Sequence, residues 1–190
     1  LGKMYAIEID ETRNLDVVLA DKIIKEKKIT FSSIHPYLST NDRANADDNI
    51  KDASEGNKVY TSEYGHARGR QVKLSVGVLY VLHELSKKYK FNVQELAGAS
   101  HSSGSQHYKG TAIDINIIDG KHVDSKNYDE EFYVQLTKAI KEMGAINVYH
   151  PYYSATRADR ATTEERRKRL RKGEKLIPQS DHYNHIHIQF

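Results

Sequence analysis

The chain has 190 residues, of which 38% are hydrophobic and 29% charged, and its formal net charge is +3 at pH 7. This length and balance predict one soluble globular domain with its own core and exclude a disordered chain. No apolar run approaches the ~20 residues that a membrane-spanning helix needs, so we expect no membrane span. Because the chain has no cysteine, any metal site has to use histidine, aspartate or glutamate.

The first half of the chain is predicted to be mainly helical. Apolar residues at helical spacing indicate a helix over residues 14–28, followed by a short strand over 29–33. Residues 36–66 are rich in Asn, Asp, Ser and Gly, so we expect a surface excursion there, with one short helix over 47–53. Apolar spacing of three and four then predicts an amphipathic helix over 71–89 that packs on the core.

The second half mixes strand and helix patterns. A helix is expected over residues 129–143, with Gly144 as its C-cap. Residues 152–180 are expected to form a second surface excursion or insertion. Strands are predicted over residues 92–99, 111–118, 145–149 and 185–190.

Basic residues gather in the second excursion, where residues 157–175 hold nine Lys or Arg against four Asp or Glu. Such an excess fits either an anionic partner or a solvated helix face. A nucleic-acid-binding protein would need a basic face with interleaved aromatic residues, and the tyrosines do not interleave with this run. We therefore expect no nucleic-acid partner.

The last predicted strand carries the sequence HIHI, residues 185–188. Successive side chains of a strand face opposite sides, so His185 and His187 share one face while Ile186 and Ile188 share the other. The strand therefore projects two imidazoles into one space and is anchored in the core by its isoleucines.

A second group lies in SGSQHYKGTAIDIN, residues 103–116. Asp114 is expected within an apolar strand, where a carboxylate is costly unless it is paired, hydrogen-bonded or bound to a metal. His107 precedes it, and Gly110 between them allows the chain to turn or to approach another backbone closely. A loop followed by a strand can place an imidazole and a carboxylate around one point.

Together with one histidine of the last strand, these residues make a His, Asp, His set. Three nitrogen or oxygen ligands with a fourth position open to water are typical of catalytic zinc, which supports amide hydrolysis. Each segment alone is weak evidence, because the chain has ten histidines and chance pairs are common. Other divalent ions can use the same ligand types.

In combination the two segments resemble the zinc peptidases of the D-Ala-D-Ala metallopeptidase group. The shared pattern is Ser-x-His, then Gly-x-Ala-x-Asp, then His-x-His, and it covers residues 71–190 in chain order. The Hedgehog signalling domain has the same fold. The resemblance implies an α+β fold in which a small, mainly antiparallel sheet carries the zinc site and helices pack on its other face.

The resemblance also implies roles for individual residues. His107, Asp114 and His187 match the zinc ligands. His185 would stand beside the metal and stabilise the oxyanion at the attacked carbonyl. Ser105 would be a supporting hydrogen-bond donor near the site.

The general base departs from the family pattern. Many members have a glutamate three residues before the last ligand, but this position is Asn184, which cannot take a proton. Asp181, six residues before His187, is the candidate base instead. The presence of Asp181 favours an enzyme. The alternative function is a zinc-containing binding module without turnover, as in the Hedgehog branch of the fold.

Substrate binding departs from the pattern as well. Family members commonly have an arginine before the His motif that meets a substrate carboxylate, but residues 97–107 contain none. Arg68 or Arg70 could take this role, since guanidinium suits carboxylates, or both could be surface charges. His101 and His182 are candidates for contacts around the ligands.

We therefore expect one metallopeptidase domain over residues 1–190, with Zn²⁺ as its cofactor. The expected reaction is hydrolysis of peptide bonds in the stem peptides of bacterial peptidoglycan, as a D,D-carboxypeptidase or an endopeptidase. The expected partner is this wall polymer or a muropeptide, and the protein is expected to be a monomer. Its expected place is extracytoplasmic, by secretion or phage delivery, although no signal is visible in the sequence.

Overall fold

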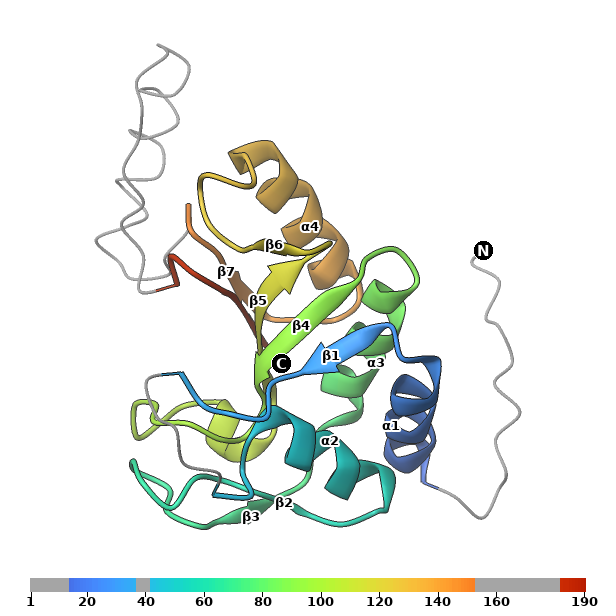
Figure 1. The fold of residues 1–190 in the computed structure, drawn as a ribbon, viewed down its shortest axis with the longest axis vertical. Helices are drawn as coiled ribbons and strands as arrows, with labels where there is room; N and C mark the ends of the chain where they lie inside the picture. The colour runs from blue at the N-terminus through green and yellow to red at the C-terminus, as the bar shows by residue number, and fades with distance from the viewer. Residues whose placement is uncertain (1–13, 37–41, 153–181) are drawn as a thin grey trace.

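The computed structural model describes residues 14–36, 42–152 and 182–190. Its main sheet has the strand order β1-β4-β5-β8-β7, and β6 pairs with β5 beside this path (Figure 1). Only β1 and β4 run parallel, and the other pairs of this sheet are antiparallel. The strands are β1 (Ile29–Phe31), β4 (Phe91–Glu95), β5 (Ala112–Ile118), β6 (Lys121–His122), β7 (Asn147–Tyr149) and β8 (Ile186–Gln189).

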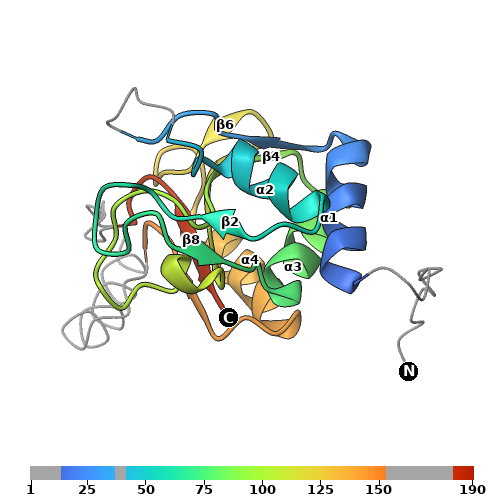
Figure 2. The same cartoon turned by 90° about the horizontal axis from the view of Figure 1, so that it is seen from below.

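Four helices accompany the sheet in the described ranges, which confirms the expected α+β class. They are α1 (Leu15–Glu26), α2 (Ala46–Ser54), α3 (Val76–Ser86) and α4 (Glu130–Glu142). Figure 2 shows α3 and α4 on one side of the sheet, as expected. Ile113 and Ile115 of β5 and both isoleucines of β8 belong to the same buried core as residues of α3 and α4, among them Leu79, Leu82 and Ile140.

Side-chain caps explain where three of these helices begin. Asn45, Ser75 and Asp129 each accept a hydrogen bond from the backbone N–H three residues ahead, which satisfies one unpaired donor of the first turn. The helix expected over 71–89 therefore starts only at Val76. The residues before it contain the two-residue strand β3 (Gln71–Val72), which pairs with β2 (Val59–Tyr60).

Part of the segment expected as a surface excursion is core. Within residues 36–66, the short helix predicted over 47–53 is α2, and it buries Ala46, Ile50 and Ala53. Val59 of β2 is fully buried as well. Few apolar residues are enough to anchor this segment in the core, because they are small or lie on one face of a short helix. The second excursion, including the basic run 157–175, lies outside the described residues apart from Tyr152.

The register of β5 against β8 places core residues on one face of the sheet and site residues on the other. Ile113 pairs with Ile188 and Ile115 with Ile186, and all four side chains are at most 2% exposed. Between these pairs Asp114 stands directly opposite His187. Directly paired residues point to the same face, so the carboxylate and the imidazole emerge together on the face away from the isoleucines.

No helix in the three described ranges is long and apolar enough to cross a membrane. This agrees with the absence of a long apolar run in the sequence.

Gly110 closes the 3₁₀ turn η1 (His107–Lys109) in the left-handed conformation, with φ at 72°. Its carbonyl oxygen accepts a hydrogen bond from Ser75 N at 2.9 Å. A Cβ at this position would lie 2.2 Å from the carbonyl oxygen of Lys73. Both expected uses of this glycine, the turn and the close approach, are therefore confirmed.

We predict that Gly110→Ala lowers the free energy of unfolding by about 2 kcal/mol or more, because strain at positive φ and overpacking add. Gly120→Ala is the matched control, since Gly120 has φ at 76° but nothing within 4 Å of an added Cβ. Gly120→Ala should lower the free energy of unfolding by only ~1–2 kcal/mol. Urea unfolding of both variants measures the difference, and equal losses would contradict the close packing of η1 on the segment before α3.

Candidate metal centre

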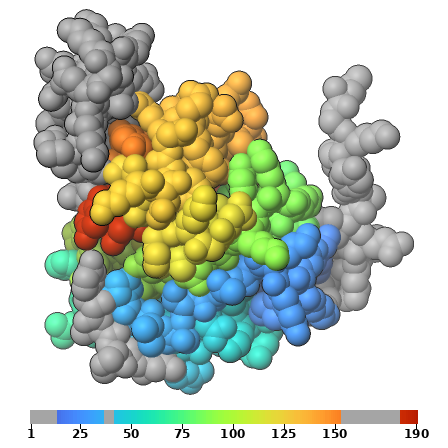
Figure 3. All heavy atoms as spheres, turned by 45° about the horizontal axis from the view of Figure 1, so that its top comes forward, coloured from blue at the N-terminus to red at the C-terminus, as the bar shows by residue number. Residues whose placement is uncertain are grey.

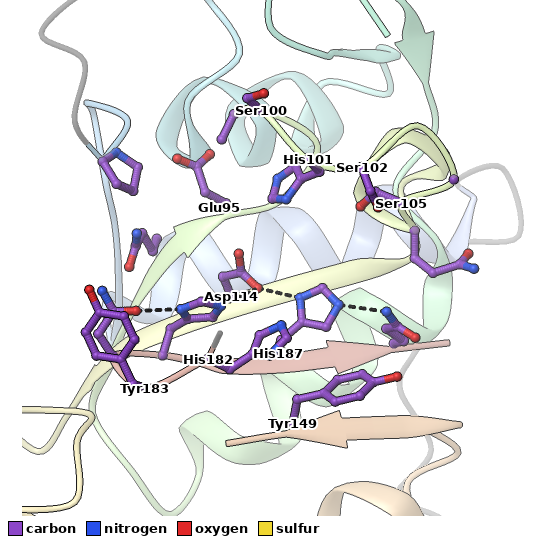
Figure 4. Close-up of a pocket in the computed structure, with 18 of the residues that line it drawn as sticks. Glu95, Ser100, His101, Ser102, Ser105, Asp114, Tyr149, His182, Tyr183 and His187 are labelled. Atoms are coloured by element: carbon purple, nitrogen blue, oxygen red, sulfur yellow. Dashed lines mark hydrogen bonds and ion pairs between the residues drawn. The ribbon is translucent and has the colours of Figure 1, made fainter. Parts of the chain in front are cut away.

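His107 of η1, Asp114 of β5 and His187 of β8 come together in space. Figure 4 shows Asp114 and His187 on the two neighbouring strands. His187 Nδ1 lies 2.6 Å from Asp114 Oδ1, and His107 Nε2 lies 3.3 Å from the same oxygen. The two imidazole nitrogens are 3.2 Å apart. Each side chain thus offers one donor atom to a common point, and all three residues are buried.

Contacts on the far side of each imidazole orient these donor atoms. His107 Nδ1 donates a hydrogen bond to the carbonyl oxygen of Leu96, which leaves the lone pair on Nε2 facing Asp114. His187 Nε2 lies 2.9 Å from the side-chain amide of Gln189, which leaves Nδ1 for the site. An imidazole fixed through its other nitrogen is the usual arrangement of a metal-binding histidine.

The charges of the site are coupled. Burial alone would raise the pKa of Asp114, but His107, His185 and His187 hold it well below its usual value. Burial alone would likewise lower the pKa of His107, and the Asp114 carboxylate raises it. The carboxylate therefore stays ionised in the folded protein and requires positive charge beside it, from protonated imidazole or from a metal ion.

The donor set fits a metal ion. Metal bonds of ~2.0–2.1 Å in tetrahedral geometry separate neighbouring donor atoms by roughly 3.3 Å. The distances of 3.2 and 3.3 Å from His107 match this spacing. The 2.6 Å between His187 and Asp114 is a hydrogen-bond length, so metal binding has to release the shared proton and widen this gap.

Three more histidines surround these donors. His101 stacks on His107 with ring centroids 4.0 Å apart. His185 Nε2 lies 3.8 Å from Asp114 Oδ1, and the His182 ring packs against both His185 and His187. Besides the inner set, two further groups among the described residues have donor atoms close enough to hold a metal, namely His101 with His107 and Asp114, and His182 with His185 and His187.

Burial keeps these outer histidines neutral. It lowers the pKa of His101 to about 3, with a further contribution from His107. It lowers the pKa of His182 to about 4 and also reduces that of His185. Neutral imidazole is the form that binds metals and accepts hydrogen bonds, so all three can support the inner set near neutral pH.

Asp114 and His187 lie in the wall of a cavity of about 930 Å³, and His107 is fully buried beside them. Ser105 also lines the cavity, and its hydroxyl accepts a hydrogen bond from His107 N at 3.3 Å. Arg68 and Arg70 are exposed and do not line this cavity, so the structure does not bring them to the ligands. Asp181, the candidate base, lies outside the described residues, and its role stays a prediction.

Sequence reasoning missed one buried group beside the donors. His35 lies 2.8 Å from both Glu95 Oε1 and Asp42 Oδ1, and Glu95 lines the same cavity. Glu95 stands opposite Asp114 across the β4–β5 pair, after a register shift that follows Val93. Such irregularities re-aim side chains near functional sites. One feature of the sequence could have indicated this group. Glu95 follows Phe91 and Val93 at the next buried position of an alternating strand.

Comparisons with protein-family models, with curated proteins and with solved structures find no match to this chain. The assignment of the site therefore depends on the sequence motifs and on the geometry of the donor atoms.

We predict that replacing His107, Asp114 or His187 by alanine weakens divalent-metal binding by more than about 100-fold. Loss of a ligand should exceed the ~10–100-fold cost of losing an outer partner. His101→Ala and His182→Ala should stay within that smaller range, and exposed His122→Ala is the neutral control. Competition with a chromophoric chelator measures each affinity. A larger loss for His101 or His182 than for His187 would contradict the assignment of the inner set.

We also predict a pH dependence from the buried His35–Glu95 pair. Burial raises the pKa of Glu95 from 4.5 to about 7. Burial alone would lower the pKa of His35, but Glu95 and Asp42 together raise it from 6.5 to about 9. Both groups bind more protons in the folded state, so their contribution to stability falls as pH rises from 4.5 through 9.

The measurement is urea unfolding of the wild type and of the His35→Gln, Glu95→Gln double variant at several pH values. The double variant removes both titrating groups of the pair and leaves a hydrogen-bonding side chain at each position. The stability advantage of the wild type should shrink steadily over that range. An advantage that grows with pH would contradict the coupling.

Proposed function

We propose that the protein is a zinc-dependent peptidase that cleaves peptide bonds in bacterial peptidoglycan. The observation that carries this proposal is the convergence of His107, Asp114 and His187 beside a large cavity that Asp114 and His187 line. These are the three residues that match the zinc ligands of the D-Ala-D-Ala metallopeptidase group. Zinc held there supplies polarisation of a carbonyl and a water whose pKa is lowered to about 7.

His185 has the position for a role in the reaction. Its Nδ1 donates a hydrogen bond to Asn184 Oδ1 at 2.8 Å, which leaves Nε2 unprotonated and directed toward Asp114, 3.8 Å away. This nitrogen can take up a proton and, as imidazolium, donate to an oxyanion formed at the attacked carbonyl. Asn184, which stands where relatives have a glutamate, thus orients His185.

Asp181 remains the candidate base that takes a proton from the attacking water. The proposed partner is peptidoglycan or a muropeptide, and the proposed place is extracytoplasmic, reached by secretion or phage delivery. A binding module that holds zinc without turnover is the competing class. Both classes need the same three ligands, so only turnover separates them.

The test is digestion of purified peptidoglycan of differing stem peptides by the zinc-loaded protein, with products identified by mass spectrometry. We predict new amine and carboxyl ends with the wild type, a rate reduced about 100–1,000-fold for His185→Ala, and comparable loss for Asp181→Ala. Both variants should still bind one zinc, weakened at most by the ~10–100-fold expected for an outer partner, so assays at saturating zinc separate a catalytic loss from a lost metal.

The exposed His66→Ala, which lines neither cavity, serves as the control and should cleave at the wild-type rate. Absence of cleavage by the zinc-loaded wild type across all wall types would favour the binding module instead.

A further inference from the structure

A second cavity of about 450 Å³ adjoins the one that Asp114 and His187 line. Tyr183 and Asn184 line both cavities, so these residues form the wall between them. The rest of the second cavity comes from the segment after β5, residues 122–126. Figure 3 shows this contact on the surface, where the red C-terminal segment lies against the yellow chain near residue 120.

Asp114 and His187 lie part-way along this combined depression. In Figure 4, Ser102 and Ser105 lie to one side of Asp114 and His187, and Tyr183 lies to the other. All five line the first cavity, and the second cavity continues beyond Tyr183. A bound chain that places its scissile bond at the ligands can therefore extend in both directions.

The size of the depression exceeds what one terminal residue needs. Pockets of ~300–1,000 Å³ hold a whole drug-sized ligand. The first cavity, at about 930 Å³, lies at the upper end of that range, and the second adds about 450 Å³. Space on this scale accommodates several residues of a branched peptide.

The chemistry of the first cavity also disfavours recognition of a free chain end. An enzyme that removes terminal residues needs a cation for the terminal carboxylate. Among the described residues, the lining of the first cavity contains neither Lys nor Arg. It offers histidine, serine, glutamine and tyrosine side chains instead, which suit the amide groups of an internal peptide segment.

We propose that the two cavities form one groove that binds a cross-linked peptide on both sides of the scissile bond, so that the protein acts as an endopeptidase. This inference rests on the proposed peptidase function and specifies its substrate class. Tyr183, 52% exposed between the cavities, packs against the peptide where it passes from one cavity to the other. Remote binding of this kind raises turnover of the longer substrate, and truncated substrates lose it.

The experiment compares a cross-linked muropeptide dimer with the corresponding uncross-linked pentapeptide monomer. We expect kcat/KM of the zinc-loaded wild type to be at least about tenfold higher for the dimer. Tyr183→Ala should remove most of this advantage, because it lowers kcat/KM for the dimer more than kcat/KM for the monomer. Tyr80→Ala on α3, 42% exposed, is the matched control and should behave as the wild type. Asn184 is left intact because it orients His185.

Three other outcomes have distinct meanings. Equal rates for dimer and monomer, with no effect of Tyr183→Ala, would overturn the groove and leave the peptidase standing. Release of terminal residues alone, abolished by Lys126→Gln in the second cavity, would overturn it in favour of a carboxypeptidase. If the wild type cleaves neither substrate, calorimetry with the same protein measures its affinity for the dimer and for the monomer. Tighter binding of the dimer that depends on Tyr183 would then support the groove while the peptidase proposal fails.

Discussion

The pairing of Asp114 with His187 across β5 and β8 is the constraint on which the rest of the site depends. The two residues stand opposite each other in register, with Ile113–Ile188 and Ile115–Ile186 pairs on either side. A slip of one residue would turn isoleucines into the cavity and the charged pair into the core. Burial of the isoleucines therefore fixes the position of the carboxylate and the imidazole at the same time.

Electrostatics adds a second requirement to this register. A buried carboxylate without a partner is costly, and Asp114 is 5% exposed. The imidazoles around it offset that cost in the protein itself, and a divalent cation at the same point would do so more strongly. His107 reaches this point because η1 and Gly110 pack against the segment before α3, and because the carbonyl of Leu96 holds its ring. Core packing, backbone hydrogen bonding and charge thus favour the same arrangement.

Local patterns in the sequence predicted much of this arrangement. Alternation in residues 112–116 and 185–188 was enough to predict which side chains share a face, since the side-chain period of a strand does not depend on its neighbours. The helices were also predicted, with bounds that shifted where a cap such as Ser75 delayed the start. The convergence of η1, β5 and β8 depended on the family resemblance, because spacing alone does not bring separate segments together.

Other features depend on contacts between distant segments. Glu95 and His35 are 60 residues apart, and the register shift after Val93 that turns Glu95 toward the cavity has no local signature. The strands β2, β3 and β6 have two residues each, too few for a periodic pattern. The second cavity forms because the chain before β8 lies against the chain after β5, and neither segment alone indicates a binding groove.

The most direct test of the central claim is a crystal structure of the zinc-loaded protein, with anomalous data collected on both sides of the zinc absorption edge. The account predicts a single zinc bonded to His107 Nε2, Asp114 Oδ1 and His187 Nδ1, with His185 unbonded beside it. A zinc held by His182, His185 and His187, or by His101 in place of His187, would contradict it.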